Sequence, residues 1–353
     1  MKKFLSVFSA FLVIVALCGC ALGAESQAGG TEGTDGLEIH FIDVGQGDAT
    51  LIKCGDKAML IDAGENDKGV LVQNYISKQG VKALDYFIVT HPHSDHCGGA
   101  DVIITKFKID TVIMPGYARD TATYRDVIQA LDYKQYKVTK PVVGDVYRLG
   151  GAKFTIIAPN KEDYGDEANN YSVGILLEHG EKKFVFTGDA EEEAEGDILA
   201  NKITISADVL KTGHHGSRTS SSEDFVQAVD PEYAVISCGE DNEYGHPHAA
   251  TLNTLRAMGM KVFRTDEQGS IIATSDGKQI TWNAAPSDTW KAGEPTKSGN
   301  KGSQEITYVL NVKSKKFHRP SCESLPKENR SDSIQSREEI IAQGYVPCKG
   351  CNP

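Results

Sequence analysis

The chain has 353 residues, of which 40% are hydrophobic, and it carries a formal net charge of -12 with a pI near 5.3. This length and apolar content suffice for one sizeable core plus a small appended module. The negative charge argues against broad adhesion to nucleic acid through net charge. It does not exclude a phosphate substrate, because bound cations can supply the attraction locally.

The amino terminus predicts export. A basic head, Met1-Lys2-Lys3, precedes an apolar run that ends near Leu17 and is too short for a comfortable membrane span. The next segment, Leu17-Cys18-Gly19-Cys20, resembles a bacterial lipobox, in which the last cysteine is lipidated. We therefore expect a signal over residues 1–20 with lipidation at Cys20, and a flexible tether over 21–36. The protein is expected at the extracellular side of the cell membrane through this lipid anchor, with plain secretion or an uncleaved anchor as alternatives.

A large domain begins at residue 37. Apolar segments separated by Gly-Asp turns predict strands over 37–44, 49–53 and 57–62, an order typical of an antiparallel meander. Apolar spacing then predicts a helix over 69–78, and a short apolar run ending at Val89 is typical of a buried strand.

The loop after Val89 places three imidazoles and a carboxylate within six positions: His91, His93, Asp95 and His96. Active sites of layered α/β proteins gather at such carboxyl ends of strands. Imidazole and carboxylate together suit zinc, iron or manganese, and His91 and His93 can face one ion while Asp95 and His96 face a second. The alternative is a polar turn whose histidines are merely solvated.

Three cysteines are scattered through this domain, and their spacing demands no disulfide framework. Burial as small apolar residues is expected for Cys54 and Cys238. Cys97 directly follows the histidine cluster, so it is either buried in the same way or a neighbour that supports the ligands.

The histidine cluster, the strand-terminal Asp62 and the turn Thr187-Gly188-Asp189 together resemble the metallo-β-lactamase superfamily over about residues 37–283. Three phrases are similar to the ComEC-like branch, the hydrolase domain of competence channel proteins; they span residues 41–49, 210–217 and 244–247. The resemblance implies an α/β (α+β layered) fold, the αββα sandwich of two mixed sheets face to face, with helices outside and metals in a cleft at one edge.

The resemblance also assigns ligands. It implies that His91 and His93 bind a first metal, that Asp95 and His96 bind a second, and that Asp189 bridges the two. Asp62 matches the acid that orients the cluster, since ligating imidazoles need outer acceptors to fix their rings. Taken alone, Asp189 would be read as an ordinary turn residue. Two divalent ions, zinc or manganese, are the expected cofactors.

One departure concerns a further histidine that most of the superfamily carries. The matching stretch here is Ala168-Asn169-Asn170-Tyr171-Ser172-Val173, so the first ion is expected to have fewer protein ligands and to exchange more readily. Asn170 is a candidate substrate-binding residue. His179 is expected in a hairpin turn beyond the next strand.

Four further histidines compete for the remaining roles. His246 is assigned to the second metal by its position after the bridging acid, and His214 or His215 to a metal or to substrate. Neighbouring side chains on an extended segment point to opposite faces, so His214 and His215 are expected not to share an ion. His248 is expected to begin a helix. Candidates are therefore catalytic at Asp62, Asp95, His214 and His215, and substrate-binding at Ser217 within a possible phosphate cradle, which could also be a polar loop that serves only packing.

A metal pair that activates water implies hydrolysis. The leading hypothesis is a phosphodiesterase or nuclease that acts on extracellular, single-stranded DNA, since the charge that builds on a phosphodiester suits two cations and an adjacent imidazole. A lactonase or β-lactamase-like hydrolase of a cyclic ester or amide is the enzymatic alternative. A surface-tethered binding module without turnover is the third. DNA or another phosphodiester is the expected partner, and no protein partner is inferred.

The tail predicts a second metal module. A linker rich in Pro, Gly, Ser and Lys spans residues 284–303, and the module over 304–353 begins with a hairpin over 306–317 and includes a capping box at 336–339 that opens a short helix. His318-x3-Cys322 and Cys348-x2-Cys351 have the spacing of a structural zinc site. A disulfide plus one free thiol is the alternative.

This module resembles the metal-binding domain of the Ada alkyl-repair proteins, but His318 stands where that family has its first cysteine, so a methyl-accepting role is not expected. Nucleic-acid contact is a hypothesis that rests on four neighbouring cations, Lys313, Lys315, Lys316 and Arg319. The alternative is a solvated basic turn.

Overall fold

The computed structural model describes residues 35–293, 308–319, 322, 324–333, 340–341, 343–349 and 351. The predicted signal, the lipidation site, nearly all of the tether and the capping box lie outside these residues. The chain divides into two compact units, Met1–Glu294 and Pro295–Pro353. Within the described ranges, every helix is too short or too polar to cross a membrane.

The first unit contains an eight-stranded sheet in the order β15-β14-β1-β2-β3-β4-β5-β6. The first three strands form the predicted antiparallel meander, and β3 to β6 pair in parallel. The members are β1 (Leu37–Phe41), β2 (Thr50–Cys54), β3 (Lys57–Ile61), β4 (Ala83–Ile88), β5 (Lys108–Ile113), β6 (Val138–Thr139), β14 (Ile271–Ser275) and β15 (Ile280–Trp282).

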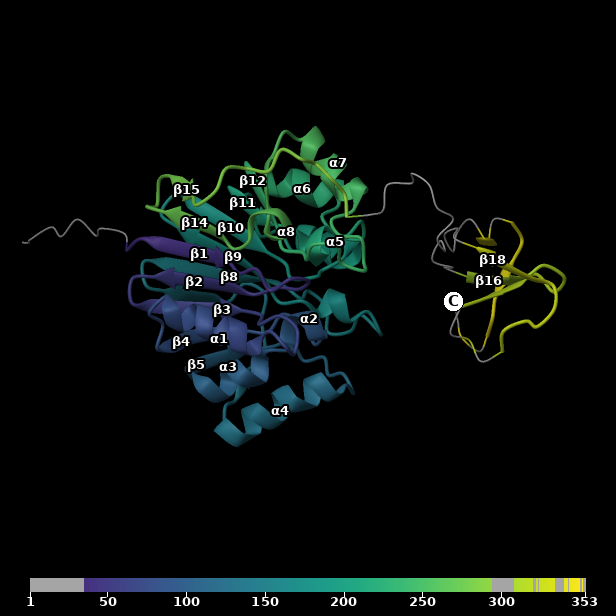
Figure 1. The fold of residues 1–353 in the computed structure, drawn as a ribbon, viewed down its shortest axis with the longest axis horizontal. Coiled ribbons are helices and arrows are strands. Elements are labelled where there is room, and N and C mark those ends of the chain that lie inside the picture. The colour runs from purple at the N-terminus through teal and green to yellow at the C-terminus, as the bar shows by residue number, and fades with distance from the viewer. Residues whose placement is uncertain are drawn as a thin grey trace, which may run out of the picture. The chain divides into compact units, whose positions relative to one another are not determined.

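A seven-stranded sheet in the order β13-β12-β11-β10-β9-β8-β7 packs against the first (Figure 1). Its strands β10 to β13 are parallel, whereas β7 to β10 are antiparallel. The members are β7 (Val146–Leu149), β8 (Ala152–Ala158), β9 (Gly174–His179), β10 (Lys182–Phe186), β11 (Val209–Lys211), β12 (Tyr233–Ile236) and β13 (Lys261–Arg264).

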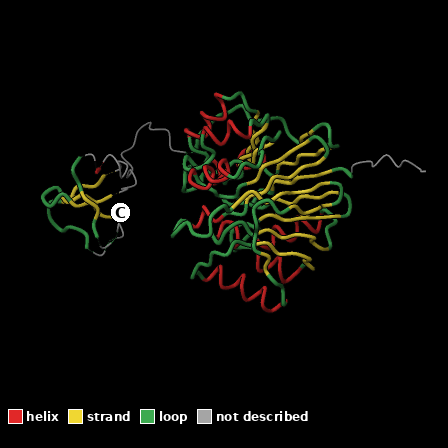
Figure 2. The backbone as a smooth tube through the Cα atoms, turned by 180° about the vertical axis from the view of Figure 1, so that it is seen from behind, coloured by secondary structure: helices red, strands yellow, loops and turns green. Residues whose placement is uncertain are grey.

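Helices cover the outer faces of both sheets, as Figure 2 shows from behind. One apolar layer joins the first sheet to four helices, and another joins the second sheet to three. The first group is α1 (Gly69–Lys78), α2 (Ser94–Cys97), α3 (Ala100–Lys106) and α4 (Ala122–Lys134), and the second is α5 (Glu192–Ala200), α6 (Glu223–Val229) and α7 (Ala249–Ala257). The short elements are α8 (Thr265–Gln268), η1 (Ala168–Tyr171) and η2 (Gly213–Gly216). The predicted αββα sandwich is confirmed.

The layer between the two sheets is rich in aromatic residues. Phe41 of β1 stacks on Phe186 of β10, and Phe154 and Phe184 are fully buried in the same cluster. Each such side chain stabilises the fold by about 1.5–3 kcal/mol relative to exposure. The strand ends that carry the metal centre therefore project from a rigid platform.

Residues 284–293, predicted to belong to the linker, instead pack on the first unit. Ser287 forms an isolated bridge with Val262, and Trp290 packs against the apolar layer under α7. The backbone N–H of Gly293 donates to the carbonyl of Pro247 at 3.0 Å. Apolar contacts of Trp290 outweigh the polar composition that indicated a linker here.

The second unit is a small sheet in the order β18-β16-β17-β19. The strands are β16 (Tyr308–Asn311), β17 (Lys316–His318), β18 (Arg330–Ser333) and β19 (Val346–Pro347). The pairing of β16 with β17 is the predicted hairpin. Among the described residues, its buried apolar cluster comprises Leu310, Phe317, Ile340 and Tyr345. A core this small contributes little stability by itself.

Candidate metal centre

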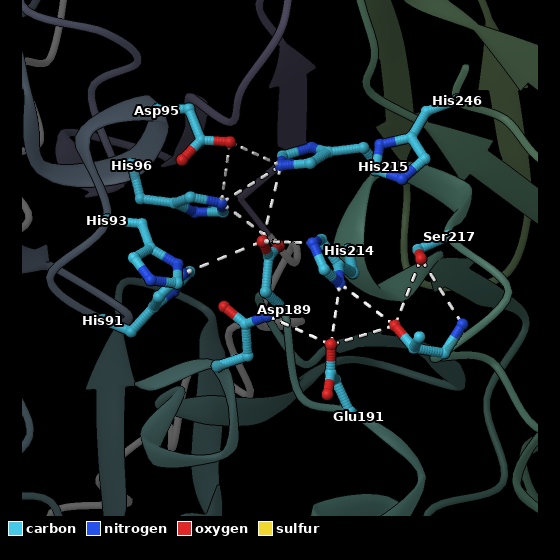
Figure 3. A network of polar contacts seen from close by, with 12 residues as sticks. His91, His93, Asp95, His96, Asp189, Glu191, His214, His215, Ser217 and His246 are labelled. Atoms are coloured by element: carbon cyan, nitrogen blue, oxygen red, sulfur yellow. Dashed lines mark hydrogen bonds and ion pairs between the residues drawn. The ribbon is translucent and has the colours of Figure 1, made fainter. Parts of the chain in front are cut away.

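The predicted ligands converge at the carboxyl ends of three strands, as Figure 3 shows. His91 follows β4, Asp189 follows β10 and His215 follows β11, and β10 pairs in parallel with β11. Parallel strands end at the same edge of a sheet, so side chains distant in sequence meet there.

His91 and His93 form a first pair of imidazoles. His91 Nε2 lies 3.0 Å from His93 Nδ1. Two nitrogens that bind one tetrahedral zinc ion at about 2.1 Å lie about 3.4 Å apart, so this separation suits two ligands of one cation. His91 Nδ1 lies 3.1 Å from Thr90 Oγ1 and 3.3 Å from Ser172 Oγ, so Nε2 is the ring nitrogen that faces His93.

His96 and His215 form a second pair, with their Nε2 atoms 3.2 Å apart. His215 Nδ1 donates to the carbonyl of Ser237 at 3.0 Å, and His96 Nδ1 donates to Asp62 Oδ2 at 2.8 Å. Each neutral ring therefore directs a lone pair from Nε2 toward the other. Two facing lone pairs repel unless a proton or a cation lies between them.

Asp189 lies between the two pairs. Its Oδ1 atom is 3.1 Å from His96 Nε2, and its Oδ2 atom is 3.5 Å from His215 Nε2 and 3.8 Å from His91 Nε2. The side chain is buried, and Oδ1 has no hydrogen bond of acceptable geometry. A buried carboxylate of this kind requires a compensating cation. The observed position is the one that the resemblance implies for a bridging ligand.

The donor set fits divalent metal ions. Nitrogen and oxygen donors in this mixture suit zinc or manganese. One group whose ligand atoms all lie within 4.8 Å of one another comprises Asp48, His96, Asp189 and His215. The predicted Asp95 lies beside it, with Oδ2 3.1 Å from His215 Nε2. The first unit therefore has a buried Asp/His site that can hold metal.

Carboxylates and imidazoles lie close together in the cluster and shift one another's pKa values. Burial lowers the pKa of His215, but the carboxylates of Asp189 and Asp95 outweigh burial and raise it to about 10. Burial raises the pKa of Asp189, yet the neighbouring imidazoles, His96 first among them, hold it well below its usual range. The carboxylates thus favour a proton between His96 and His215, and a cation can take the place of that proton.

Asp62 orients the cluster from behind, as the resemblance implies. Its Oδ1 atom accepts the backbone N–H of Thr90 at 2.8 Å, and its Oδ2 atom accepts the Thr90 hydroxyl at 2.7 Å and His96 Nδ1. The side chain is buried, and its backbone has a left-handed φ of 58°. Its contacts are therefore those of a positioning residue, not of a group that reaches substrate.

His214 and His215 do not lie on an extended segment, so the premise that they face opposite sides is wrong. Both have left-handed backbone angles, φ 48° and 56°, within η2. His214 Nε2 comes within 3.7 Å of Asp189 Oδ2, close to the corresponding distance for His215. His214 Nδ1 contacts Glu191 Oε1 and Thr219 Oγ1, each at 3.2 Å. Nothing in local spacing predicts a left-handed turn at two histidines.

His246 is near the centre but not within the closest group. Its ring centroid lies 5.4 Å from that of His214 and 6.0 Å from that of His215, and its Nδ1 atom is 3.4 Å from Gln46 Nε2. His248 is the N-cap of α7, the predicted helix start, and its Nδ1 atom accepts the Arg218 N–H at 2.9 Å. The assignment of His246 to a metal stays a prediction.

Asn170 and Ser217 are buried residues that support their neighbours. Asn170 Oδ1 accepts the backbone N–H of Glu191 at 3.0 Å, and Ser217 Oγ lies 3.1 Å from Thr219 Oγ1. Each is only 3% exposed, and these contacts are those of positioning residues, so substrate contact by either side chain stays a prediction. His179, predicted in a hairpin turn, is the buried last residue of β9 and lies 3.0 Å from Ser275 Oγ.

Several residues of the site were not predicted. Lys211 Nζ forms a buried ion pair with Asp48 Oδ2 at 2.9 Å, and Asp48 Oδ1 lies 3.7 Å from His215 Nδ1. Ser172 Oγ accepts the backbone N–H of Asp189 at 3.1 Å, and Glu191 holds His214. Of these residues, Glu191 is the one that the sequence could have indicated, because it lies two positions after Asp189.

A pocket of about 390 Å³ opens over the metal ligands. Its walls combine ligand residues with a cation, two threonines and a tyrosine from other loops. The lining residues are Pro92, His93, Ser94, Asp95, Arg119, Thr121, Thr123, Asp189, His214 and Tyr244.

The second unit carries its own cluster, the predicted set of His318, Cys322, Cys348 and Cys351. The four ligand atoms lie within 4.8 Å of one another, and His318 Nδ1 is 3.4 Å from Cys322 Sγ. Among the described residues, these cysteines form no disulfide. One imidazole and three sulfurs suit tetrahedral zinc, so the residues fit a closed structural site.

A family model described as the metallo-beta-lactamase superfamily matches residues 42–240. The chain belongs to the metallo-beta-lactamase superfamily. ComE operon protein 3 of Bacillus subtilis (strain 168) is 32% identical over 254 residues, which cover 66% of this chain and 32% of that protein. Competence protein ComA of Neisseria gonorrhoeae is 30% identical over 233 residues, 65% of this chain and 31% of that protein.

The chain thus spans about a third of the length of these two competence proteins. Among solved structures, the metallo-beta-lactamase fold protein YhfI from Bacillus subtilis aligns with a TM-score of 0.43 and 14% identity, over 65% of this chain and 96% of that one. The predicted relationship to competence proteins within the superfamily is confirmed. The protein is accordingly a member of the metallo-beta-lactamase superfamily with a buried Asp/His site that can hold metal.

Proposed function

We propose that this protein is a dinuclear metal-dependent phosphodiesterase that cleaves single-stranded DNA at the extracellular side of the cell membrane. The observation that carries the proposal is the position of the Asp189 carboxylate between two converging imidazole pairs. The similarity to competence proteins supports DNA as the substrate class.

The two pairs would hold one cation each. His91 and His93 would bind the first, His96 and Asp95 the second, and Asp189 both. Two divalent cations, when bound, make water a nucleophile near neutral pH and neutralise the charge that builds on a phosphodiester. His215 supports the second site better than His246 does, because its Nε2 atom lies 3.1 Å from Asp95 Oδ2 and 3.2 Å from His96 Nε2.

His214 is suited to protonate the leaving oxygen. It lines the pocket, its side chain is 23% exposed, and Nε2 is the ring atom that faces Asp189. Nδ1 is held by Glu191, whose pKa burial would raise but the hydrogen bonds from His214 and Asn169 lower. An ionised carboxylate that accepts from Nδ1 keeps an imidazole ring fixed, and it stabilises the imidazolium form that a general acid requires.

Extracellular location is part of the proposal and rests on residues 1–36, of which nearly all lie outside the described residues. The lipobox-like Leu17-Cys18-Gly19-Cys20 supports lipid attachment at Cys20. Cys20→Ser should move the protein from the membrane fraction to the medium. Retention in the membrane fraction would favour an uncleaved anchor instead.

Turnover of three substrate classes tests the proposed chemistry. The full chain is loaded with zinc or manganese and given bis(p-nitrophenyl) phosphate, a cephalosporin and an acyl lactone, and a labelled single-stranded oligonucleotide follows. We expect hydrolysis of the phosphodiester and of the oligonucleotide. Asp189→Asn should lower both rates at least about 100-fold, the upper end for loss of a residue that merely supports a metal ligand. Asp132→Asn, the same change on the exposed face of α4, is the matched control.

Other outcomes separate the alternatives. Activity on the cephalosporin or the lactone alone would overturn the phosphodiesterase in favour of a cyclic ester or amide hydrolase. Three bound ions per chain, two for the large unit and one for the small unit, without turnover of any substrate would favour the metal-bound binding module. Metal analysis of Asp189→Asn accompanies both rate measurements and shows whether the variant has lost metal.

A further inference from the structure

Arg119 is an exposed guanidinium on the wall of the metal pocket. It lies in the segment between β5 and α4 and lines the pocket together with His93 and Asp189. Within the described ranges, no carboxylate forms an ion pair with Arg119.

A cation in this position has no structural role that the contacts reveal. Metal ions would repel a guanidinium, so its place beside their ligands is unfavourable unless an anion joins them there. The phosphate that is cleaved would be neutralised by the metals themselves. A guanidinium matches a second phosphate group well, because its planar fork can donate two parallel hydrogen bonds.

Tyr244 supplies a different kind of surface to the same pocket. It comes from the segment between β12 and α7, on the second sheet, whereas Arg119 follows a strand of the first. The side chain is 56% exposed, and its ring lies nearly parallel to that of His246, with centroids 5.7 Å apart and 18° between planes. An exposed aromatic ring beside a phosphodiester site is a stacking platform for an unpaired base.

We propose that Arg119 binds a phosphate adjacent to the scissile one and that Tyr244 stacks on a base of the same strand. This inference rests on the proposed phosphodiesterase. The site then recognises an oligonucleotide over at least two phosphates and favours a single strand, because a base paired within a duplex would have to leave its stack to reach Tyr244. A small phosphodiester without flanking nucleotides offers neither a second phosphate to Arg119 nor a neighbouring base to Tyr244.

The ratio of kcat/KM for a single-stranded oligothymidylate to that for bis(p-nitrophenyl) phosphate tests the inference in the zinc- or manganese-loaded full chain. Arg119→Ala should lower this ratio about tenfold or more through KM for the oligonucleotide, since a charge-assisted hydrogen bond is lost. The dependence of log KM on log salt should also become shallower by about 0.7 per lost phosphate contact. Arg119→Lys, which keeps the charge but not the fork, should lose less.

Tyr244→Ala should lower the ratio about fivefold or more, and Tyr244→Phe should restore it, because the ring and not the hydroxyl stacks. Arg148→Ala on β7, an exposed arginine that does not line the pocket, is the matched control and should change neither substrate. Equal losses of kcat/KM on both substrates in Arg119→Ala and Tyr244→Ala, or no loss on either, would overturn the proposed roles of Arg119 and Tyr244. The proposed phosphodiesterase would still stand. A wild-type protein that hydrolyses neither substrate would overturn the phosphodiesterase itself and the inference with it.

Discussion

The metal cluster of the large unit and that of the small unit are held in place in different ways. In the large unit, protein groups already fix the ligands: Asp62 accepts from His96, and the carbonyl of Ser237 accepts from His215. In the small unit, the ligands border the short strands β17 and β19, and the apolar cluster around Phe317 is small. The fold therefore holds the ligands of the first site in place, whereas we expect a bound metal to stabilise the fold of the small unit.

Metal removal should separate the two units most sharply. Chelation should unfold the small unit, since structural zinc contributes about 10 kcal/mol or more to such modules, while the large unit stays folded and loses activity. Hydrogen exchange followed by mass spectrometry on the full chain reads both units at once. Cys348→Ser should reproduce the loss of protection in the small unit alone. Unfolding by a reductant without a chelator would instead indicate a disulfide.

The Lys211–Asp48 ion pair tests how rigidly the large unit holds its site. Both side chains are less than 10% exposed, and the pair lies behind His215. Lys211→Met leaves a buried carboxylate without a counter-charge and should lower the free energy of unfolding by about 3–5 kcal/mol. Chemical denaturation measures the change. The double variant Lys211→Met, Asp48→Leu should recover most of it, and failure to recover would mean that the lysine acts through other contacts.

Asp62→Asn should weaken the dinuclear centre without unfolding the unit. The amide oxygen can still accept from the backbone N–H of Thr90, but an amide nitrogen in place of Oδ2 cannot accept from the Thr90 hydroxyl and His96 Nδ1. We expect about 10- to 100-fold lower metal affinity, measured by competition with a chromogenic chelator. Asp101→Asn, on the partly exposed side of α3, is the control. An unchanged affinity would remove Asp62 from the positioning role.

Substitution of Cys97 should change stability and metal content least, in contrast to substitution of Cys348. It is fully buried, and burial raises the pKa of its thiol to about 12, which disfavours the thiolate that a metal requires. Cys97→Ala should cost about 1 kcal/mol and leave metal content unchanged, as measured by thermal denaturation and metal analysis. Loss of one ion from the large unit would show that Cys97 is a ligand.

Local spacing in the sequence predicts much of both sites. His91, His93, Asp95 and His96 share one loop, so their proximity needs no knowledge of the fold. The short spacings from His318 to Cys322 and from Cys348 to Cys351 likewise bring each pair of ligands together without knowledge of the fold. The meander, the helix over 69–78 and the hairpin of the tail follow from periodicity and turn residues.

Contacts between distant segments could not be predicted from spacing. Asp48 and Lys211 are 163 positions apart and meet because β11 ends near the turn after β1. The left-handed turn at His214 and His215 depends on what packs around η2, and Arg119 and Tyr244 meet at one pocket only because the two sheets face each other. The sequence by itself determined which ligand types this protein possesses and which of them share a loop. Only the tertiary structure decided which nitrogens face one another, what holds each ring and what lines the pocket, because these depend on sheet register and packing across the sandwich.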